Sequence, residues 1–206
     1  MIEALEVVSG RTVSRETFDR LSAYVELLKS EAERQNLIAS STLETVWERH
    51  VLDSAQLARF APANGATWAD IGSGAGLPGL VLAILVRDPI TLIEPRRLRA
   101  EFLQRAVDHL DLSGRVHVNA AKVERVTGKF DVITARAVAP VDALFAISNH
   151  LSTNGTTWIL PKGRNAQSEL AQAKRNWHCE ARVEQSRTDP DSEILVLTKV
   201  GAKKRR

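Results

Sequence analysis

The sequence predicts an α/β protein with a Rossmann-like, seven-stranded, mostly parallel sheet that ends in an antiparallel hairpin, preceded by an N-terminal helical extension. Three observations predict this fold. From about residue 67 onward, short β-type segments alternate with helical ones, which is typical of parallel strands joined by crossover helices. A glycine-rich run directly follows the first of these strands. The last two strands have only a turn between them, so they must run antiparallel to each other.

The first sixty or so residues predict helices. Ser14 is a suitable N-cap for a first long helix. The apolar side chains of that helix recur at helical spacing, at Phe18, Leu21, Val25 and Leu28. Ser41 and Glu44 have the spacing of a capping box, which predicts that a second helix begins at Ser41. The apolar face of this second helix would consist of Leu43, Val46, Trp47 and Val51.

The rest of the chain predicts seven strands and three crossover helices. The strands are expected at residues 67–71, 90–94, 115–119, 130–134, 156–160, 179–187 and 193–199. The helices are expected at residues 77–87, 96–111 and 141–151. The sequence Asp189-Pro190-Asp191 marks the turn of the terminal hairpin. Seven strands that end in this way are the layout of Rossmann-like class I methyltransferases, whereas dinucleotide-binding dehydrogenases more often have six parallel strands.

Length and composition are those of one globular domain in a reducing compartment. The chain has 206 residues, 44% of them hydrophobic, and its only cysteine is Cys179, so an internal disulfide is excluded. The longest apolar stretch, residues 77–86, is about half as long as a membrane helix, and no signal-peptide pattern is present. We therefore expect a cytoplasmic protein with no membrane partner. Within the one domain, we expect a helical extension at residues 1–62, a core at residues 63–200 and a basic tail at residues 201–206.

The net charge of +3 is small, but the basic residues are clustered. Arg96, Arg97, Arg99 and Arg105 lie in one segment, and residues 203–206 are all lysine or arginine. Clusters of this kind are typical of surfaces that bind phosphate, so Arg96 and Arg97 are candidate RNA-binding residues. A solvated helix face and a frayed tail would give the same pattern, and the charges alone leave both interpretations open.

The run from Asp70 to Gly79, DIGSGAGLPG, carries the strongest chemical signal. It follows a strand and opens a helix, where glycines allow a tight turn and the close approach of a ligand. Gly72, Gly74 and Gly76 form the G-x-G-x-G pattern of methyltransferases, but a shift of two residues gives the G-x-G-x-x-G pattern of dinucleotide-binding proteins. Asp70 favours a methyltransferase, because a carboxylate suits the amino-acid end of S-adenosylmethionine and would repel a pyrophosphate. The long helical segment before the motif favours the same cofactor.

Glu94 is a second expected cofactor ligand. It ends the predicted strand at residues 90–94, where a carboxylate accepts hydrogen bonds from both ribose hydroxyls of an adenosine. This role fits S-adenosylmethionine and NAD equally well. The neighbouring Arg96 and Arg97 could hold the 2′-phosphate of NADP, which keeps a dehydrogenase open as an alternative. Asp70 and the helical extension favour the methyltransferase.

The segment after the fourth strand indicates which kind of acceptor the chain would methylate. Residues 134–139 read TARAVA and do not contain the Asn/Asp-Pro-Pro-aromatic motif of enzymes that methylate exocyclic amines. No well-spaced cysteine pair supports a thiol nucleophile for attack at a pyrimidine carbon. These absences favour an acceptor that needs no activation. Guanine N7 is such an acceptor, because its lone pair can attack once it is positioned.

Two other kinds of site are not expected. His50, Asp53 and Ser54 share one helix face but are too close in sequence to converge as a hydrolase triad, and the chain has no nucleophile elbow. His50 and Asp53 are then either a pair on the helix surface or part of the wall of the cofactor pocket. The five histidines form no H-x-H or H-x-x-x-H pair, so we expect no metal.

Several specific motifs resemble one family over nearly the whole chain, from about residue 21 to residue 199. They are Arg49-His50 with Asp53-Ser54, the intact GAGLPG of residues 74–79, Phe102-Leu103, Arg136-Ala137 and Lys162-Gly163. In this combination the sequence resembles the bacterial 16S ribosomal RNA guanine-N7 methyltransferases, also called glucose-inhibited division protein B. The resemblance implies S-adenosylmethionine as cofactor and methylation of guanine 527 (rRNA numbering) in the 530 loop of 16S rRNA, within the small ribosomal subunit. It implies no obligate protein partner.

The resemblance also implies roles for individual residues around the cofactor. Gly72 and Leu77 would line the cofactor site, together with the other glycines of the loop. Val123 and Glu124 would hold the adenine. Glu94 stands where the family often has aspartate, a change that the ribose contact should tolerate.

Further positions implied by the resemblance concern the target. Arg136 would lie where cofactor and target meet and, with Lys122, would be a catalytic residue. The family commonly has arginine in place of Lys122, so the charge is kept and the bidentate geometry is lost. Lys162 would lie at the rim of the RNA-binding cleft. The sequence Glu31-Ala32 replaces the Trp-Asn of the family, a departure that affects a local contact and not the fold.

Two alternatives of other kinds stay open. A methyltransferase of the same fold could act on a small molecule, which would leave the basic clusters without a role. A non-catalytic RNA-binding or assembly factor could keep a nucleoside pocket. Methyl transfer to small ribosomal subunits distinguishes the three hypotheses.

Overall fold

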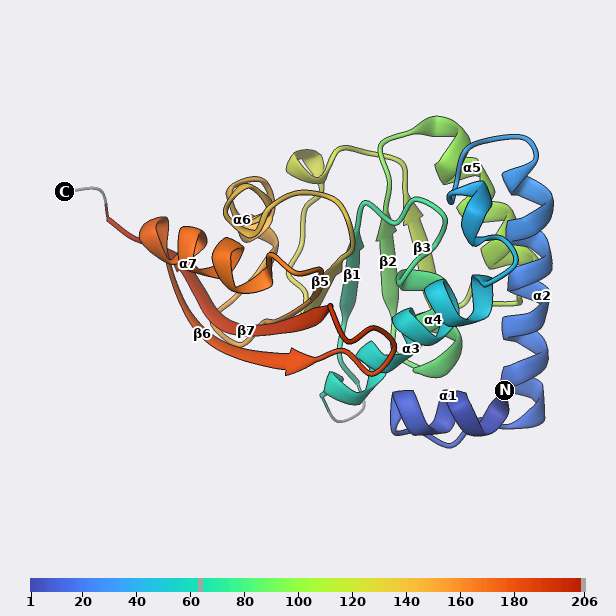
Figure 1. The fold of residues 1–206 in the computed structure, drawn as a ribbon. Coiled ribbons are helices and arrows are strands. Elements are labelled where there is room, and N and C mark those ends of the chain that lie inside the picture. Colours follow the sequence, from blue (N-terminus) through green and yellow to red (C-terminus); the bar gives the residue numbers. More distant parts are fainter. Residues whose placement is uncertain (63–64, 205–206) are drawn as a thin grey trace.

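The computed structural model describes residues 1–62 and 65–204 and contains one seven-stranded sheet (Figure 1). Its strands are β1 Trp68–Ile71, β2 Ile90–Ile93, β3 Val116–Asn119, β4 Val132–Ala135, β5 Thr157–Lys162, β6 Trp177–Gln185 and β7 Glu193–Ala202. Their order in the sheet is β3-β2-β1-β4-β5-β7-β6. The strands from β3 to β5 are parallel, and β7 runs antiparallel to both β5 and β6. The predicted Rossmann-like sheet with its terminal hairpin is therefore confirmed.

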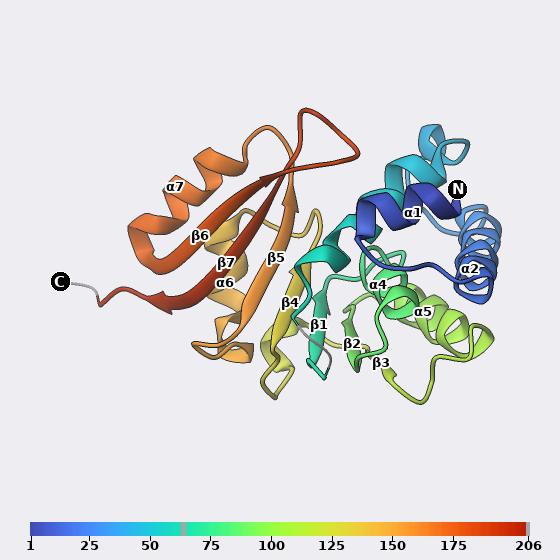
Figure 2. The same ribbon diagram turned by 90° about the horizontal axis from the view of Figure 1, so that it is seen from below.

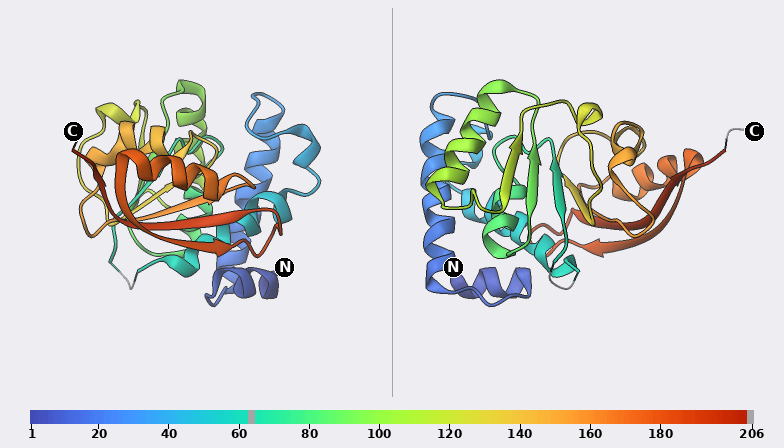
Figure 3. Two further views of the ribbon diagram at one scale, coloured as in Figure 1. Left: turned by 60° about the vertical axis from the view of Figure 1, so that its left-hand side comes forward. Right: turned by 180° about the vertical axis from the view of Figure 1, so that it is seen from behind.

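Helices cover both faces of the sheet (Figure 2). On one face lie α4 Gly79–Leu85 and α5 Arg97–His109, and on the other lie α6 Val141–Ser148 and α7 Ala166–Asn176. Of the N-terminal helices, α2 Arg15–Ala32 adds a further layer outside α4 and α5, and α1 Ile2–Ser9 packs against the helical turns of residues 47–60. The shorter helical turns are η1 Ser40–Thr42, η2 Trp47–Leu52, α3 Asp53–Ala55, η3 Gln56–Phe60, η4 Val123–Arg125 and η5 Asn149–Leu151. Strand β7 ends on the side of the molecule opposite α1 and α2 (Figure 3).

Alternation along the strands divides the core into two halves. Successive strand side chains point to opposite faces, so Leu92 packs with the α4 and α5 side while Ile93 packs with the α6 and α7 side. The first half also contains buried side chains of the N-terminal helices, such as Leu21. Residues before and after the predicted boundary at residue 62 thus share one core. The boundary itself adjoins residues 63–64. These two residues, and residues 205–206 of the predicted basic tail, lie outside the described part of the chain.

The predicted capping box at Ser41 is wrong. Residues Ser40–Thr42 form a short 3₁₀ turn without a side-chain cap, and the next helical segment begins near Trp47 as a π-helical turn. The Thr42 hydroxyl donates to Ala39 O at 2.7 Å, so a hydroxyl of this segment closes a local turn rather than capping a helix. Ser14, by contrast, caps α2 as expected, because its Oγ accepts the Thr17 N–H at 3.1 Å.

The crossover helices are found close to the predicted ranges, with two differences. Helix α4 begins at Gly79, after Pro78, and is shorter than the range of residues 77–87. Helix α7 between β5 and β6 was not predicted, because its buried stripe consists of small residues and one leucine: Ala166, Leu170 and Ala173. Within the described ranges, no helix is long and apolar enough to cross a bilayer.

Candidate functional site

The loops that follow the parallel strands meet at one edge of the sheet. Strands β3, β2, β1 and β4 lie side by side in that order, so the loops after their carboxyl ends are neighbours. The strand order reverses between β1 and β4, and ligands of open α/β sheets bind at the carboxyl edge next to such a reversal. The topology therefore brings together four predicted groups: the glycine loop after β1, Glu94 after β2, η4 after β3 and Arg136 after β4.

The glycine loop needs its glycines for two different reasons. Gly72, Gly74 and Gly76 all have φ between +55° and +92°, a range that other residues rarely adopt. A Cβ on Gly72 would lie 2.6 Å from Val138 Cγ2, and a Cβ on Gly76 would lie 2.5 Å from Leu80 Cδ1. At Gly74 the nearest heavy atoms, Arg99 Nη1 and Gly72 O, would be 3.7 Å from a Cβ, which is ordinary van der Waals contact. Gly74 is therefore required by its φ of +55° rather than by a close neighbour.

Asp70 lies buried beneath the glycine loop. Its side chain is 1% exposed. Oδ2 accepts the Gly79 N–H at 3.2 Å, and Oδ1 accepts the Thr134 hydroxyl at 2.8 Å. Burial raises the pKa of Asp70 to about 6, although these hydrogen bonds and the charge of Arg136 act in the opposite direction. The contacts of Asp70 support a role in holding the loop, and a direct contact with the cofactor stays a prediction.

Glu94 links the end of β2 to the glycine loop at Gly74. Its Oε2 accepts the Gly74 N–H at 2.9 Å, and its Oε1 accepts the Arg96 N–H at 2.9 Å. The side chain is buried, and each carboxylate oxygen has a second lone pair for a further donor. The position suits a ligand with two neighbouring hydroxyls that approaches beside Gly74.

The turn after β3 presents a mixture of buried and exposed side chains. Val123 is buried and packs in the same half of the core as Ile71. Lys122 and Glu124 on either side of it are exposed. The buried Val123 fixes the turn against the sheet, while its neighbours remain accessible from solvent at the edge that carries Glu94. Leu77 is also buried, directly after the glycines.

Arg136 forms an ion pair that the sequence did not reveal. Its Nη1 lies 3.2 Å from Asp53 Oδ2, and the Arg136 and Asp53 side chains are about one fifth exposed, at 20% and 22%. His50 lies in the same region, with its Nε2 2.8 Å from Thr42 Oγ1. Burial, with the charge of Arg136 acting in the same direction, lowers the pKa of His50 to about 4. His50 is therefore neutral at pH 7, and Asp53 is part of the wall of the site.

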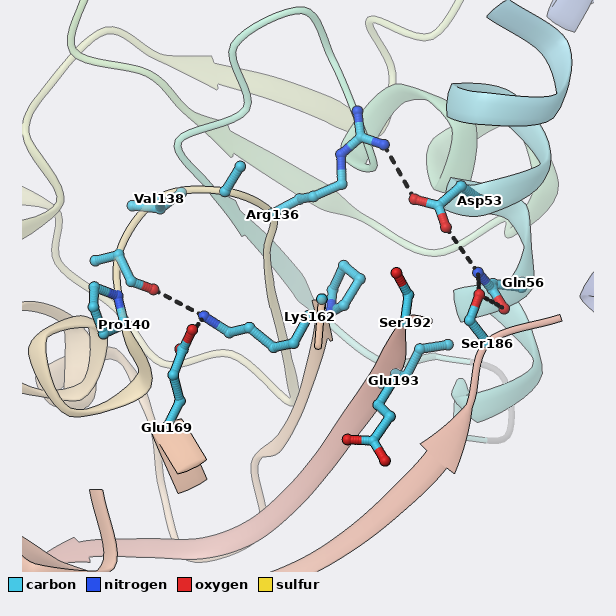
Figure 4. A pocket seen from close by; sticks show the side chains of 15 residues that line it. Asp53, Gln56, Arg136, Val138, Pro140, Lys162, Glu169, Ser186, Ser192 and Glu193 are labelled. Carbon is cyan, nitrogen blue, oxygen red and sulfur yellow. Dashed lines mark hydrogen bonds and ion pairs between the residues drawn. The ribbon is translucent and has the colours of Figure 1, made fainter. Parts of the chain in front are cut away.

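A cavity of about 440 Å³ opens beside Arg136 (Figure 4). It is lined by Asp53, Gln56, residues 136–140, residues 161–163, Glu169, Ser186, Ser192, Glu193 and Ile194. The glycines do not line this cavity, but Val138 does, and Val138 also contacts the backbone at Gly72. The 136–140 loop therefore separates the cavity from the glycine loop. The structure thus places the cavity beside Arg136 next to the glycine loop, with Val138 between them.

Lys162 does not present a free ammonium group to the cavity. Its Nζ donates to Ala139 O at 2.9 Å and lies 2.9 Å from Glu169 Oε2. The same Glu169 oxygen accepts the Val141 N–H at 3.2 Å. Lys162 lines the cavity, and its contacts hold the 136–140 loop in place. Its predicted place at the rim of an RNA-binding cleft stays a prediction. The exposed Arg96 and Arg97 lie at the carboxyl edge, and Arg97 pairs with Glu101 at 2.6 Å.

Tyr24 is a further residue of the site that the sequence analysis missed. This residue of α2 is fully buried, and its hydroxyl donates to Ala75 O in the glycine loop at 2.9 Å. Burial raises the pKa of Tyr24, so the hydroxyl keeps its proton. Its position between Leu21 and Leu28 on the apolar stripe was a usable signal, because a tyrosine in a core needs a hydrogen-bond partner. In residues 1–62 and 65–204, no group of acidic, histidine or cysteine side chains could hold a metal ion.

Comparisons with known proteins point to one family. A family model described as rRNA small subunit methyltransferase G (GidB) matches residues 17–193. The chain is 49% identical over 184 residues to ribosomal RNA small subunit methyltransferase G of Novosphingobium aromaticivorans, covering 87% of this chain and 80% of the relative. It is 42% identical over 203 residues to the protein of the same name from Zymomonas mobilis subsp. mobilis, covering 94% of this chain and 91% of the relative.

Solved structures share the fold at low sequence identity. The ribosomal protein L11 methylase from Lactobacillus delbrueckii subsp. bulgaricus aligns with a TM-score of 0.58 and 16% identity, over 73% of this chain and 78% of that chain. TrmN from Thermus thermophilus aligns with a TM-score of 0.55 and 20% identity, over 74% of this chain and 49% of that chain. These similarities concern the fold alone, and the fold is that of Rossmann-like methyltransferases.

Proposed function

The chain belongs to the rRNA small subunit methyltransferase G family, and we propose on this premise that it transfers a methyl group from S-adenosylmethionine to N7 of guanine 527 in the 530 loop of 16S rRNA. The observation that supports this proposal most directly is the arrangement at the carboxyl edge of the sheet. The Gly74 N–H of the glycine loop is bonded to the Glu94 carboxylate. The same loop lies next to Val138, and Val138 lines the cavity beside Arg136. Methyl transfer needs two such neighbouring sites, one for the donor and one for the acceptor.

The residues at this edge fit S-adenosylmethionine. The Glu94 carboxylate lies at the glycine loop, bonded to the Gly74 N–H, and is placed to accept hydrogen bonds from two ribose hydroxyls. Val123 and Glu124, in the turn after β3, would contact the adenine. The bound cofactor supplies a methyl group on a positively charged sulfur, which a neutral lone pair can attack. Asp70 would act through the loop that it supports.

The cavity beside Arg136 is the proposed place for the acceptor guanine. Its volume of about 440 Å³ lies within the range of about 300–1,000 Å³ that is usual for small-ligand sites. The Arg136 guanidinium can donate to guanine O6 or to a phosphate, which leaves the N7 lone pair free for attack. Because N7 already carries this lone pair, the protein needs no catalytic base and contributes mainly by positioning.

The partner would be 16S rRNA, presented within the small ribosomal subunit. The exposed Arg96 and Arg97 lie at the carboxyl edge of the sheet and suit phosphate contacts. Lys162 would contribute indirectly, because its ammonium group is already paired with Glu169. Lys122 is exposed beside the adenine-contacting turn and is the other basic residue proposed to act near the reaction. A cytoplasmic location follows from this partner.

The test is methyl transfer from S-adenosylmethionine with a labelled methyl group to small subunits that lack the modification. We expect label in 16S rRNA as 7-methylguanosine at one position, located by strand cleavage after borohydride and aniline treatment. Free 16S rRNA and a set of small acceptors run in parallel. Label in a small acceptor alone would show a small-molecule methyltransferase, and binding to subunits without any transfer would show a non-catalytic factor. Calorimetry should show binding of S-adenosylmethionine, and tight binding of NADP would overturn the cofactor assignment.

The pH dependence of the rate tests the choice of acceptor atom. Guanine N7 is not protonated near neutral pH, so we expect a single-turnover rate that is nearly flat from about pH 6.5 to about pH 9, a range that begins at the reference pKa of histidine. His50→Asn should keep this profile flat, because the pKa of His50 is already lowered to about 4 by burial. A rate that climbs about tenfold per pH unit below pH 7 would indicate a catalytic base and a different acceptor.

A further inference from the structure

A chain of hydrogen bonds links the turn between β6 and β7 to Arg136. Asp53 lies at its centre, with Oδ2 paired to Arg136 Nη1 at 3.2 Å. The other carboxylate oxygen, Oδ1, accepts from Thr188 Oγ1 at 2.9 Å and from Gln56 Nε2 at 3.0 Å. Figure 4 shows Asp53 between Arg136 on one side and Gln56 on the other. One oxygen of Asp53 thus faces the proposed catalytic residue, and the other faces the hairpin turn.

Gln56 ties the helical segment to the turn. Its side chain is fully buried, at 0% exposure. The Oε1 atom accepts the Arg187 N–H at 2.8 Å, and Nε2 lies 3.1 Å from Ser186 Oγ and 3.0 Å from Thr188 Oγ1. A buried amide is costly unless its hydrogen bonds are made. The amide is therefore satisfied only when the turn occupies this position against the helical segment.

The location of these contacts indicates more than a role in stability. A buried polar network stabilises a fold little better than apolar packing would, but it selects one arrangement of the groups in it. Here the selected arrangement ends at a side chain in the site. Ser186 and Ser192, at the two ends of the turn, line the cavity beside Arg136. The turn is a wall of that cavity as well as a support for it.

We propose that Thr188 and Gln56 are positioning residues that hold the Arg136 guanidinium at the acceptor cavity through Asp53. This inference rests on the proposed function, in which Arg136 acts at the site of methyl transfer. Under this inference, the turn between β6 and β7 contributes to the site of methyl transfer, although it lies fifty or more residues after Arg136 in the sequence. The contacts of Gly74 and Glu94 involve none of these residues, so the cofactor site should be independent of them.

The test replaces the Thr188 hydroxyl with a methyl group of similar size. In Thr188→Val, Asp53 Oδ1 loses one of its two donors and the carboxylate is no longer fixed against Arg136. We expect the single-turnover rate of methylation to fall roughly tenfold to a hundredfold, the range that a misplaced group costs. The Kd for S-adenosylmethionine should change by less than about twofold, a margin well below the tenfold that corresponds to 1.4 kcal/mol. Thr188→Ser keeps the hydroxyl and should restore the rate.

A second measurement reports the position of Arg136 without any methylation. The ¹⁵N signal of the Arg136 Nε–H group, assigned by its loss in Arg136→Lys, should shift or broaden in Thr188→Val and return in Thr188→Ser. Thr156→Val is the matched control, because the Thr156 hydroxyl likewise donates a hydrogen bond, to Phe130 O at 2.6 Å, but lies before β5 at the opposite edge of the sheet. This control should lower the thermal stability and leave the Arg136 signal in place.

The two measurements separate failure of the inference from failure of the proposed function. An Arg136 signal that is unchanged in Thr188→Val would overturn the positioning role, whatever the activity. A signal that moves while the native protein methylates no rRNA would support the positioning of Arg136 and overturn the proposed function. A rate loss that Thr188→Ser does not recover would assign Thr188 to packing and would also overturn the inference.

Discussion

Asp70 is a buried carboxyl whose protonation should be visible in the stability of the protein. Its side chain is 1% exposed, and burial raises its pKa to about 6. In the unfolded chain the pKa returns to about 3.9. A carboxyl with a higher pKa in the folded state binds its proton more tightly when the protein is folded. Its contribution to stability is therefore fully present below about pH 3.9 and is lost as the pH rises through about 6.

The magnitude follows from the difference between the two pKa values. About two pKa units at about 1.4 kcal/mol each give a total of about 3 kcal/mol. Between about pH 4.5 and about pH 7.5, the same two pKa values give a change of about 2 kcal/mol. Asp70→Asn removes this titration and keeps the size of the side chain. Its amide oxygen can accept the Gly79 N–H, and its amide nitrogen can donate to Thr134 Oγ1 in place of the bonds seen here.

The assay is reversible urea unfolding of the native protein and of Asp70→Asn at several pH values. All other titrating groups are common to the two proteins, so the difference between their free energies of unfolding isolates Asp70. We expect this difference to move in favour of Asp70→Asn by about 2 kcal/mol between about pH 4.5 and about pH 7.5. A difference that is the same at both ends of this range would refute the reasoning, because it would show that the Asp70 pKa is not raised by folding.

The remaining predictions concern the site. Gly74→Val should abolish binding of S-adenosylmethionine in calorimetry, because a branched side chain at a φ of +55° strains the loop proposed to hold the cofactor; Gly128→Val, also at positive φ but before β4 at the opposite edge, is the control that should keep binding. Glu94→Ala should weaken the same binding by about 1–3 kcal/mol, and unchanged affinity would remove Glu94 from the cofactor site. Arg136→Ala should lower the methylation rate severely with a small change in thermal midpoint, and Arg136→Lys should recover it only in part, since the guanidinium fork is lost. Deletion of residues 203–206 should reduce both the affinity for small subunits and its dependence on salt, and an unchanged salt slope would assign this segment to solvent.

The sequence by itself determined the sheet and the place of the glycine loop. Both depend on local patterns: alternation of strand and helix signals sets the parallel order, and the run from Asp70 to Gly79 places glycines where the backbone adopts positive φ. The place of Glu94 at this edge could be predicted for the same reason, because it follows the end of a strand, while its contact with a cofactor stays a prediction. Such features can be predicted because a few neighbouring residues decide them.

The capping box at Ser41 and the missed helix α7 show where local patterns fail. At Ser41 the hydroxyl of the neighbouring Thr42 closes a turn and contacts His50, a competition that spacing alone does not reveal. In α7 the buried stripe has only one large side chain, Leu170, so its periodicity is weak. In both segments, contacts with other parts of the chain decide the structure.

Only the tertiary structure decided how the acceptor side of the site is built. The sequence places Arg136 after β4, but its partner Asp53 lies 83 residues before it, and Thr188, which bonds to Asp53, lies 135 residues after Asp53. Lys162 carries a charge that suits RNA, yet the fold pairs that charge with Glu169. The physical reason is that hydrogen bonds and ion pairs join atoms a few ångströms apart in space, and a sequence does not record which distant segments meet. The glycine loop proposed for the cofactor is local, whereas the cavity proposed for the base is assembled from distant segments of the chain.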